Sequence, residues 1–220
     1  INNFSSTIRI NQTFDLIIDC CAEPSVEQSK KSIREAKKVF DTNLLGTFNI
    51  IAKCLKDKAK LIFLSSSRVY SIQDLRNFKK EINKKIYKKE IDINFKTSNP
   101  KSLYGYTKLA SEDLIKEFNY SNKLTFIINR IGVISGPWQF GKVDQGFLSL
   151  WSWLHLNNKK IKYIGFNGSG LQVRDVLHID DLCELILIQI LKFKTIKNLT
   201  LSFGGGKSNA INLKSLTKKY

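Results

Sequence analysis

The chain has 220 residues, enough for one domain with a sizeable core, and its 42% hydrophobic content excludes an intrinsically disordered chain. The formal net charge is +17, but the lysines are scattered in pairs such as Lys30-Lys31 and Lys159-Lys160, so we assign most of them to solvated faces. The sequence has neither a zinc-site spacing nor an RNA-binding aromatic motif, which argues against nucleic acid as a partner.

The sequence also bears on the compartment. No apolar run reaches the roughly 18 residues that a membrane span needs, and the apolar stretch 182–191 contains Glu184 and Gln189. The absence of methionine means that Ile1 is not a translation start, so we expect a fragment of a longer protein. No disulfide spacing is evident, and Cys20 and Cys21 look like small buried residues inside a strand, so we expect a reducing, cytoplasmic setting.

The hydrophobic pattern alternates between short apolar runs and helical repeats. This alternation is typical of an α/β fold with a parallel sheet and right-handed crossovers. The predicted strands are 14–21, 60–65, 124–131, 162–164, 173–179 and 199–203; the predicted helices are 32–56, 102–120 and 145–156, with Asp180 or Asp181 as the N-cap of a further helix and another helix under way at the C-terminal end.

The pattern becomes less regular after Gly136-Pro137, which indicates an inserted lobe. Gly204-Gly205-Gly206 invites comparison with a phosphate-binding loop. It lacks the Gly-x-Gly-x-x-Gly spacing and the long helix that should follow, so we interpret it as a turn.

Two motifs carry most of the chemical information. Ser65, Ser66 and Ser67 end the strand predicted at 60–65, and ligands of open α/β sheets bind at the carboxyl ends of strands. Tyr104 and Lys108 are spaced to share one face of the next helix. A tyrosine acts as a base near neutral pH only beside positive charge, and a serine hydroxyl can hydrogen-bond the same substrate oxygen. Ser66, Tyr104 and Lys108 therefore predict proton transfer at a substrate hydroxyl.

Taken in order, these motifs resemble the extended short-chain dehydrogenase/reductase family of nucleotide-sugar epimerases and dehydratases. The resemblance implies a Rossmann-like doubly wound parallel sheet, whose first strands would precede Ile1, with a small substrate-binding lobe. Residues 1–135 would be the C-terminal part of the NAD-binding Rossmann domain, and 136–220 the lobe interleaved with the last Rossmann elements. The segments that carry the resemblance are 19–22, 43–49, 66–70, 104–108, 130–137 and 172–181.

The resemblance also implies roles for single residues. Tyr104 as a phenolate would take a proton from a sugar hydroxyl while NAD accepts hydride from the same carbon, and hydride would then return to the other face. Lys108 would lower the pKa of Tyr104 and hold the cofactor ribose, and Ser66 would hydrogen-bond the reacting oxygen. The implied cofactor-binding residues are Cys21, Ala22, Asn43, Ser65, Tyr104 and Lys108, and the implied substrate-binding residues are Ser67, Arg68, Lys142, Gln145 and Arg174, with no metal ligand.

Alternatives remain for Arg174 and for three polar residues between positions 142 and 145. Arg174 would clamp the diphosphate of a nucleotide sugar, or it would form a structural ion pair with Asp175. Lys142, Asp144 and Gln145 would line the sugar pocket, or they would be ordinary polar residues at a helix start.

Segments 63–71 and 136–146 look most like the CDP-paratose 2-epimerase branch of this family. That branch implies a CDP-linked deoxyhexose and a role in lipopolysaccharide O-antigen biosynthesis. Related 4,6-dehydratases carry an Asp-Glu pair where Ser67 and Arg68 stand, so dehydration is disfavoured, although another reductase or dehydratase of the family stays open.

A truncated, non-catalytic homologue is the remaining alternative, because the glycine-rich phosphate loop and the acidic ribose-binding residue would precede Ile1. A cofactor-free binding protein on the same fold belongs to this alternative. We also expect a homodimer or a higher homo-oligomer, in which the helices that carry Phe48 and Leu114 could pair across the interface.

Overall fold

A computed structural model of the chain describes residues 1–82, 91–142, 145–163 and 166–219. The chain divides into two compact units. The first contains residues 1–130 and 193–202, and the second contains 131–192 and 203–220. Each unit has its own sheet and its own apolar core.

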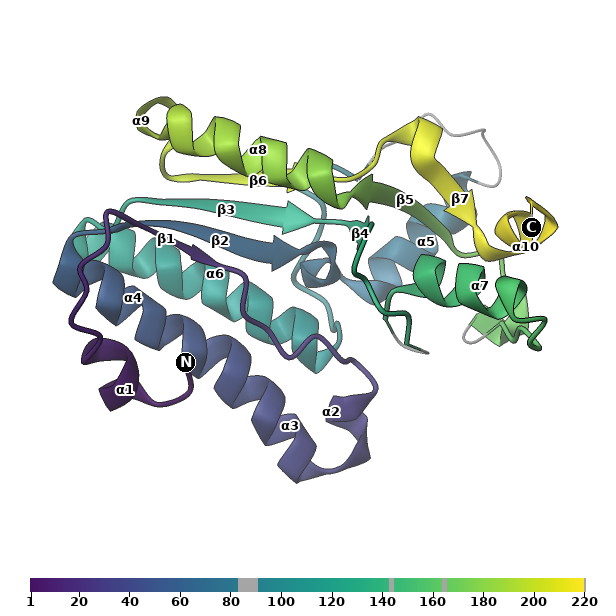
Figure 1. The fold of residues 1–220 in the computed structure, drawn as a ribbon, viewed down its shortest axis with the longest axis horizontal. Coiled ribbons are helices and arrows are strands. Elements are labelled where there is room, and N and C mark those ends of the chain that lie inside the picture. Colours follow the sequence, from purple (N-terminus) through teal and green to yellow (C-terminus); the bar gives the residue numbers. More distant parts are fainter. Residues whose placement is uncertain (83–90, 143–144, 164–165, 220) are drawn as a thin grey trace. The chain divides into compact units, whose positions relative to one another are not determined.

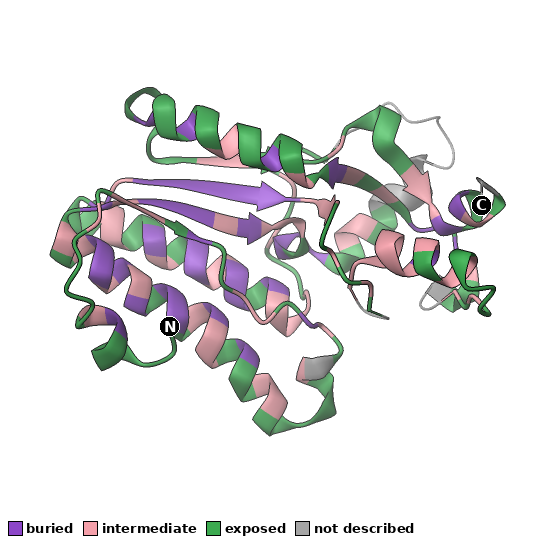
Figure 2. Cartoon of the chain, viewed as in Figure 1, coloured by how far each residue is buried: buried purple, intermediate pink, exposed green. Residues whose placement is uncertain are grey.

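The first unit is built on a four-stranded sheet in the order β1-β2-β3-β6. β1 and β2 are parallel, in a register that places Asp19 beside Phe63, and β2 and β3 are buried along most of their length (Figures 1 and 2). Strands buried on both faces read as continuous apolar runs, which is why the sequence predicted them. The strands are β1 Leu16–Asp19, β2 Lys60–Ser66, β3 Phe126–Ile131 and β6 Leu199–Phe203.

Helices α4 and α6 lie side by side against one face of this sheet (Figure 1). The predicted helix 32–56 is interrupted, because a π-helical turn over Asp41–Leu45 separates two α-helices. Ser32 caps the first of them by accepting from the Glu35 N–H, and Ser102 caps α6 by accepting from Gly105. The helices are α1 Phe4–Ile8, α2 Gln28–Lys31, α3 Ile33–Phe40, α4 Gly46–Asp57, α5 Ile72–Ile82, α6 Leu103–Asn122 and α9 Phe193–Ile196.

The core of the first unit lies between the sheet and these helices. Leu61 and Phe63 of β2 point toward Ile51 of α4 and Ile115 of α6, and all four side chains are fully buried. Each such side chain stabilises the fold by about 1.5–3 kcal/mol relative to an exposed one. The core therefore holds α6 against β2, and with it the residues at the start of that helix.

The second unit has a three-stranded sheet in the order β4-β5-β7. β4 and β5 are parallel, and β5 and β7 are antiparallel. Its core contains Trp151, Leu213 and Leu216, and the Trp151 ring stacks on Tyr163. The elements are β4 Val133–Ser135, α7 Phe147–Leu156, β5 Val173–His178, α8 Ile179–Leu191, β7 Ala210–Asn212 and α10 Leu213–Lys219, with short 3-10 turns at Phe166–Gly168 and Lys207–Asn209.

Two predictions for this unit need correction. The N-cap of α8 is His178, whose Nδ1 accepts from the Asp180 N–H at 3.3 Å. Asp180 and Asp181 lie in the first helical turn, because β5 continues directly into α8 and leaves no residue between them. The strand predicted at 162–164 is absent at Lys162 and Tyr163, and position 164 lies outside the described residues. The glycine run 204–206 forms no helix, as expected of a turn.

The cysteines also differ from expectation. All four are free thiols, but Cys20 and Cys21 are exposed, so the prediction that they are buried is wrong. The reason is that β1 ends at Asp19, and both thiols follow it where the chain leaves the sheet. Within the part of the chain that the structure describes, no helix combines the length and apolar character needed to cross a membrane.

Candidate functional site

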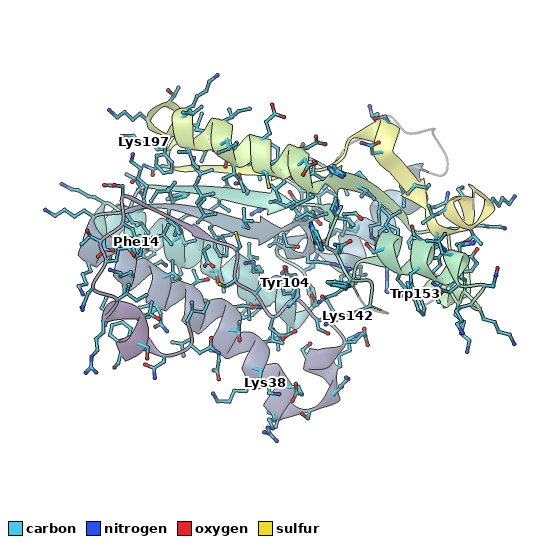
Figure 3. All side chains as sticks on the ribbon, in the orientation of Figure 1. Phe14, Lys38, Tyr104, Lys142, Trp153 and Lys197 are labelled. Atoms are coloured by element: carbon cyan, nitrogen blue, oxygen red, sulfur yellow. The ribbon has the colours of Figure 1, made fainter. Side chains whose placement is uncertain are left out.

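The centre of the candidate site is a contact between the end of β2 and the start of α6. Ser66 ends β2 and its Oγ accepts the Arg68 N–H at 3.1 Å, which starts the 3-10 turn Ser67–Val69. Because that oxygen already accepts from the backbone, its own proton is available to Tyr104. The side chains of Ser66 and Tyr104 share a hydrogen bond, and Tyr104 projects from the first turn of α6 (Figure 3).

Gly105 is what allows α6 to come this close to the turn. A Cβ atom at position 105 would lie 2.1 Å from the carbonyl oxygen of Arg68, far inside van der Waals contact. Backbone cannot rotate away as a side chain can, so any other residue at 105 would push the helix from the turn. The Ser66–Tyr104 contact therefore depends on a residue with no side chain next to Tyr104.

The acidity of Tyr104 is set by its surroundings. Burial raises the pKa of Tyr104, because desolvation disfavours the phenolate, while the hydrogen bond from Ser66 and the charge of Arg68 act against this rise. The part expected of Lys108, to lower the pKa of Tyr104, stays a prediction, and Ser66 and Arg68 act in the same direction. Ser67 is half-buried in the same turn, and Arg68 is exposed.

Lys108 lies on α6 one helical turn after Tyr104 and is only 2% exposed. Its Nζ sits 4.1 Å from the centre of the Phe63 ring, a cation–π contact. Burial lowers the pKa of Lys108 to about 8, and the charges of Asp19, Cys20, Cys21 and Glu112 act against that change. Among the residues that the structure describes, no acceptor hydrogen-bonds to this ammonium group.

Asn43, predicted to bind the cofactor, cross-links three segments through its side chain and its carbonyl. Its Oδ1 accepts the Glu23 N–H at 2.7 Å, and its Nδ2 donates to the Thr107 Oγ1 at 3.0 Å. The Asn43 carbonyl accepts hydroxyl hydrogens from Thr47 and Ser111. Asn43 lies in the π-helical turn and so ties the segment after β1 to α6.

Ser65 is also engaged within the protein, in a buried charged network that the motif analysis missed. Its hydroxyl donates to Glu112 Oε1 at 2.5 Å, and Glu112 accepts from Arg130 through Nε at 3.1 Å and Nη2 at 2.8 Å. The Arg130 guanidinium lies over the Tyr70 ring. One sequence signal was available, since Glu112 follows Lys108 at the spacing that puts both on one helix face.

The segment after β1 contributes the remaining predicted residues of the first unit. Asp19 Oδ1 accepts the Cys21 N–H at 3.0 Å, which turns the chain out of the strand. Ala22 is half-buried and Cys21 is exposed. The structure thus brings together Ser66, Tyr104 and Lys108, with Cys21, Asn43, Ser65 and Arg68 on the elements around them.

The other predicted substrate residues lie in the second unit. Lys142 and Gln145 are joined by two backbone hydrogen bonds, Lys142 N–H to Gln145 O at 2.7 Å and Gln145 N–H to Lys142 O at 3.1 Å. Asp144 lies outside the described residues. Arg174 donates through Nη1 to the Val173 carbonyl, and its charge helps to hold down a pKa of Asp175 that burial raises.

Comparison with known proteins places these geometries in context. A model of the family described as NAD dependent epimerase/dehydratase matches residues 1–200. The chain is 31% identical over 176 residues to a dTDP-D-glucose 4,6-dehydratase of Dictyostelium discoideum, which covers 78% of this chain and 37% of that protein. It is 25% identical over 192 residues to a CDP-paratose 2-epimerase of Salmonella typhi, with 81% of this chain and 55% of that protein covered.

The fold is shared with solved structures as well. A dTDP-glucose 4,6-dehydratase of Streptomyces venezuelae, solved as a double mutant with NAD, matches with a TM-score of 0.78 and 20% identity, over 99% of this chain and 60% of that one. The chain therefore spans about half the length of the curated relatives that it matches, or less.

Proposed function

This chain belongs to the NAD-dependent epimerase/dehydratase family, and we propose that the protein containing it is an NAD-dependent epimerase of nucleotide sugars. We further propose a CDP-linked deoxyhexose as the substrate, inverted at carbon 2. NAD, when bound, accepts a hydride from the sugar carbon and gives it back. A cytoplasmic setting and a place in O-antigen biosynthesis are parts of the same proposal.

The observation that carries the proposal is the hydrogen bond between Ser66 and Tyr104, with Lys108 one turn along the same helix. A sugar hydroxyl that becomes a ketone must lose a proton, and Tyr104 takes it as the phenolate, the form that Ser66 and the charge of Arg68 favour against burial. Ser66 orients the reacting oxygen through its hydroxyl. When the ketone is reduced again, Tyr104 returns the proton, so the residue ends each turnover as it began.

The first unit offers groups that fit the ribose of such a cofactor. The Lys108 ammonium is buried and has no hydrogen-bond acceptor among the described residues, while a ribose offers hydroxyl oxygens that accept. The site also lies at the carboxyl ends of parallel strands, where ligands of this fold class bind. We propose that the cofactor lies beside Cys21, Ala22, Asn43 and Ser65. Asn43 and Ser65 would act indirectly, through the backbone and the helices that their hydrogen bonds hold in place.

The choice of substrate and reaction is supported by the sequence around the site. Ser67 and Arg68 stand where the related dehydratases carry an acidic pair, and elimination of water needs such extra acid and base groups. The residues proposed to bind the nucleotide sugar are Ser67, Arg68, Lys142, Gln145 and Arg174. A guanidinium suits a diphosphate because it donates two parallel hydrogen bonds. The second candidate is a 4,6-dehydratase, favoured by the 31% identity to one such enzyme.

The test is the substitution Tyr104→Phe in the longest natural polypeptide that contains this chain. Removal of the hydroxyl should lower turnover of a CDP-sugar by about 100-fold or more, because no other group takes the proton. Tyr106→Phe is a matched control, since Tyr106 is half-exposed on the same helix turn and should leave turnover unchanged. Near-normal turnover by Tyr104→Phe would refute the assignment.

Released cofactor separates the remaining alternatives. Heat-denatured wild-type protein should release NAD, measured by mass, because an enzyme that regenerates its cofactor in each turnover can keep it bound. A protein that holds no NAD and binds none when it is added is the non-catalytic homologue. A 4-keto-6-deoxy product, detected by mass and absorbance, identifies the dehydratase instead.

We also propose that the protein self-associates through the helices that bear Phe48 and Leu114. Phe48 is partly exposed on α4 and packs against Phe4 and Phe118. Multi-angle light scattering should give twice the mass of one polypeptide. Phe48→Glu should shift the mass toward that of one polypeptide, because a carboxylate is costly to bury in an apolar contact.

A further inference from the structure

We infer that Asp19 is a positioning residue that keeps the Lys108 ammonium group charged. Asp19 begins one of the segments that carry the family resemblance, but its carboxylate was given no role there, and its catalytic consequence rests on the proposed function. The electrostatic part of the inference concerns only residues of the first unit and can be tested without cofactor or sugar.

The strand register places Asp19 next to the aromatic ring that Lys108 contacts. Asp19 is the last residue of β1 and pairs with Phe63 of β2 in a parallel register. Paired residues of neighbouring strands point to the same face of a sheet. The Lys108 Nζ lies 4.1 Å from the centre of that Phe63 ring. Asp19 and Lys108 therefore lie on one face of the sheet, beside the same aromatic side chain.

Asp19 is held firmly but without a close cation. Its Oδ1 accepts the Cys21 N–H at 3.0 Å, and the residue is 2% exposed. Its Oδ2 lies 3.4 Å from the Thr47 hydroxyl oxygen, whose proton is shared with the closer Asn43 carbonyl at 2.7 Å. Within the described part of the chain, it forms no ion pair within 4.0 Å. A buried carboxylate with only neutral donors is costly, so attraction to a nearby buried ammonium has unusual weight.

The other groups that face Lys108 are less able to hold its charge. Glu112 is already paired, since Arg130 donates to both of its oxygens and Ser65 to one of them. Cys20 and Cys21 are thiols, which carry charge only when they lose their protons. Asp19 is thus the one carboxylate facing Lys108, among the described groups, that is not committed to another cation.

The ionisation of both groups agrees with this geometry. Burial lowers the pKa of Lys108 to about 8 and raises the pKa of Asp19, and in each case the strongest opposing influence is the other residue. Both shifts favour the neutral forms, so burial outweighs the attraction between Asp19 and Lys108. Because the pKa of Lys108 is still about 8, Lys108 remains mostly charged at neutral pH. Without the Asp19 charge, the same burial would lower the pKa of Lys108 further and reduce its charged fraction at neutral pH.

The decisive experiment follows the titration of Lys108 in Asp19→Asn. The protein is the longest natural polypeptide containing this chain, with 13C at the lysine ε-carbons, observed by NMR without cofactor or sugar. The Lys108 signal is identified by its loss in Lys108→Met. Asp19→Asn should lower the Lys108 midpoint by about 1 pH unit or more, as loss of an adjacent opposite charge does.

Asp15→Asn is the matched control, because Asp15 is an exposed carboxylate just before the same strand and should leave the midpoint in place. An unchanged midpoint in Asp19→Asn overturns the inference. If Asp19→Asn does not fold, the reciprocal measurement decides: Lys108→Met should raise the Asp19 midpoint, read from its carboxyl 13C signal, and an unchanged Asp19 midpoint overturns the inference equally.

The catalytic consequence has a separate readout. If the proposed function holds, the pH at which turnover begins to fall on the alkaline side should drop in Asp19→Asn by the same interval as the Lys108 midpoint. A variant that lost activity only through a structural defect would keep the wild-type pH profile at a lower maximum. Absence of any turnover in the wild-type protein would count against the proposed function alone, since the NMR titration needs none.

Discussion

At the scale of single residues, Lys108 is a cation that the fold buries at a cost. Its folded-state pKa of about 8 lies below the ordinary 10.5, so between these values the unfolded chain binds more protons than the folded one. Stability must therefore rise with pH across this window, and the full cost of burying the charge is present below it. The shift corresponds to about 3 kcal/mol at most.

Lys108→Met should remove that dependence. Urea unfolding at a series of pH values should show wild-type stability rising relative to the variant from about pH 8 to 10.5. Lys116→Met is the control, because Lys116 is partly exposed on the same helix and should keep the wild-type slope. Parallel curves for wild type and Lys108→Met would show that the buried ammonium does not titrate in this window.

Residue types alone could not say which polar groups would face a ligand. The assignment of Asn43 and Ser65 to the cofactor rests on resemblance and stays a proposal. The sequence did not reveal that their side chains bond to Thr107 and Glu112, partners 64 and 47 positions away. The spacing of Tyr104 and Lys108 could be read from the sequence because it is local. The pairing of Ser65 with Glu112 could not, because it depends on how β2 packs on α6.

At the scale of elements, Gly105 fixes the distance between α6 and the turn after β2. Gly to Ala inside a helix ordinarily stabilises by about 1 kcal/mol. Here the added methyl would meet the Arg68 carbonyl oxygen at 2.1 Å, and overpacking against backbone costs about 1–3 kcal/mol. Gly105→Ala should therefore destabilise the protein, and displacement of α6 should break the Ser66–Tyr104 hydrogen bond.

Two measurements check this substitution. Urea unfolding gives the stability, and an ultraviolet titration, with Tyr104→Phe as the reference, gives the Tyr104 midpoint, which should rise when the Ser66 bond is lost. Gly46→Ala is the control, since its methyl would come too close only to the flexible end of the Ile1 side chain, which can move aside, and would meet the Asp41 carbonyl oxygen at an ordinary 3.7 Å. Equal effects of the two substitutions would argue against the close approach at Gly105.

The link between α6 and β3 is electrostatic. Glu112 is fully buried and accepts from Arg130, so Glu112→Gln would leave the guanidinium without a counter-charge. Breaking a buried pair from one side costs about 3–5 kcal/mol. We expect a loss in this range by urea unfolding. The control Asp113→Asn alters an exposed pair with Lys116 and should change stability by about 0.5 kcal/mol or less, and a similar loss in both variants would contradict the prediction.

Helix and strand periodicity predicted most of these elements, but not their irregularities. The apolar spacing of 32–56 continues through the π-helical turn, since one extra residue changes which side chains face inward without interrupting the pattern. Strands β4 and β7 have three residues each and are only half-buried or exposed, so they leave no periodicity to detect.

At the scale of the whole chain, the parallel pairing of β1 with β2 was predictable because βαβ alternation allows few other solutions, whereas the antiparallel pair of β5 and β7 was not. The net charge of +17 was equally plain, and it leads to a last prediction about salt. Salt weakens exposed pairs such as Lys30–Glu27, which are worth at most about 1 kcal/mol each, but it also screens the mutual repulsion of the excess lysines.

Screening of the repulsion should have the larger effect on stability, because the excess cations all repel one another while the exposed ion pairs are local and weak. Raising NaCl from about 0.01 to 0.15 M shortens the screening length from about 30 to 8 Å, so the free energy of unfolding of the 220-residue chain should rise. Urea is the denaturant to use, since guanidinium chloride would itself screen the charges. A fall in stability with salt would contradict this prediction. It would mean that the lysines form ion-pair networks with the acidic residues, and that the lysine pairs along the sequence are not simply solvated.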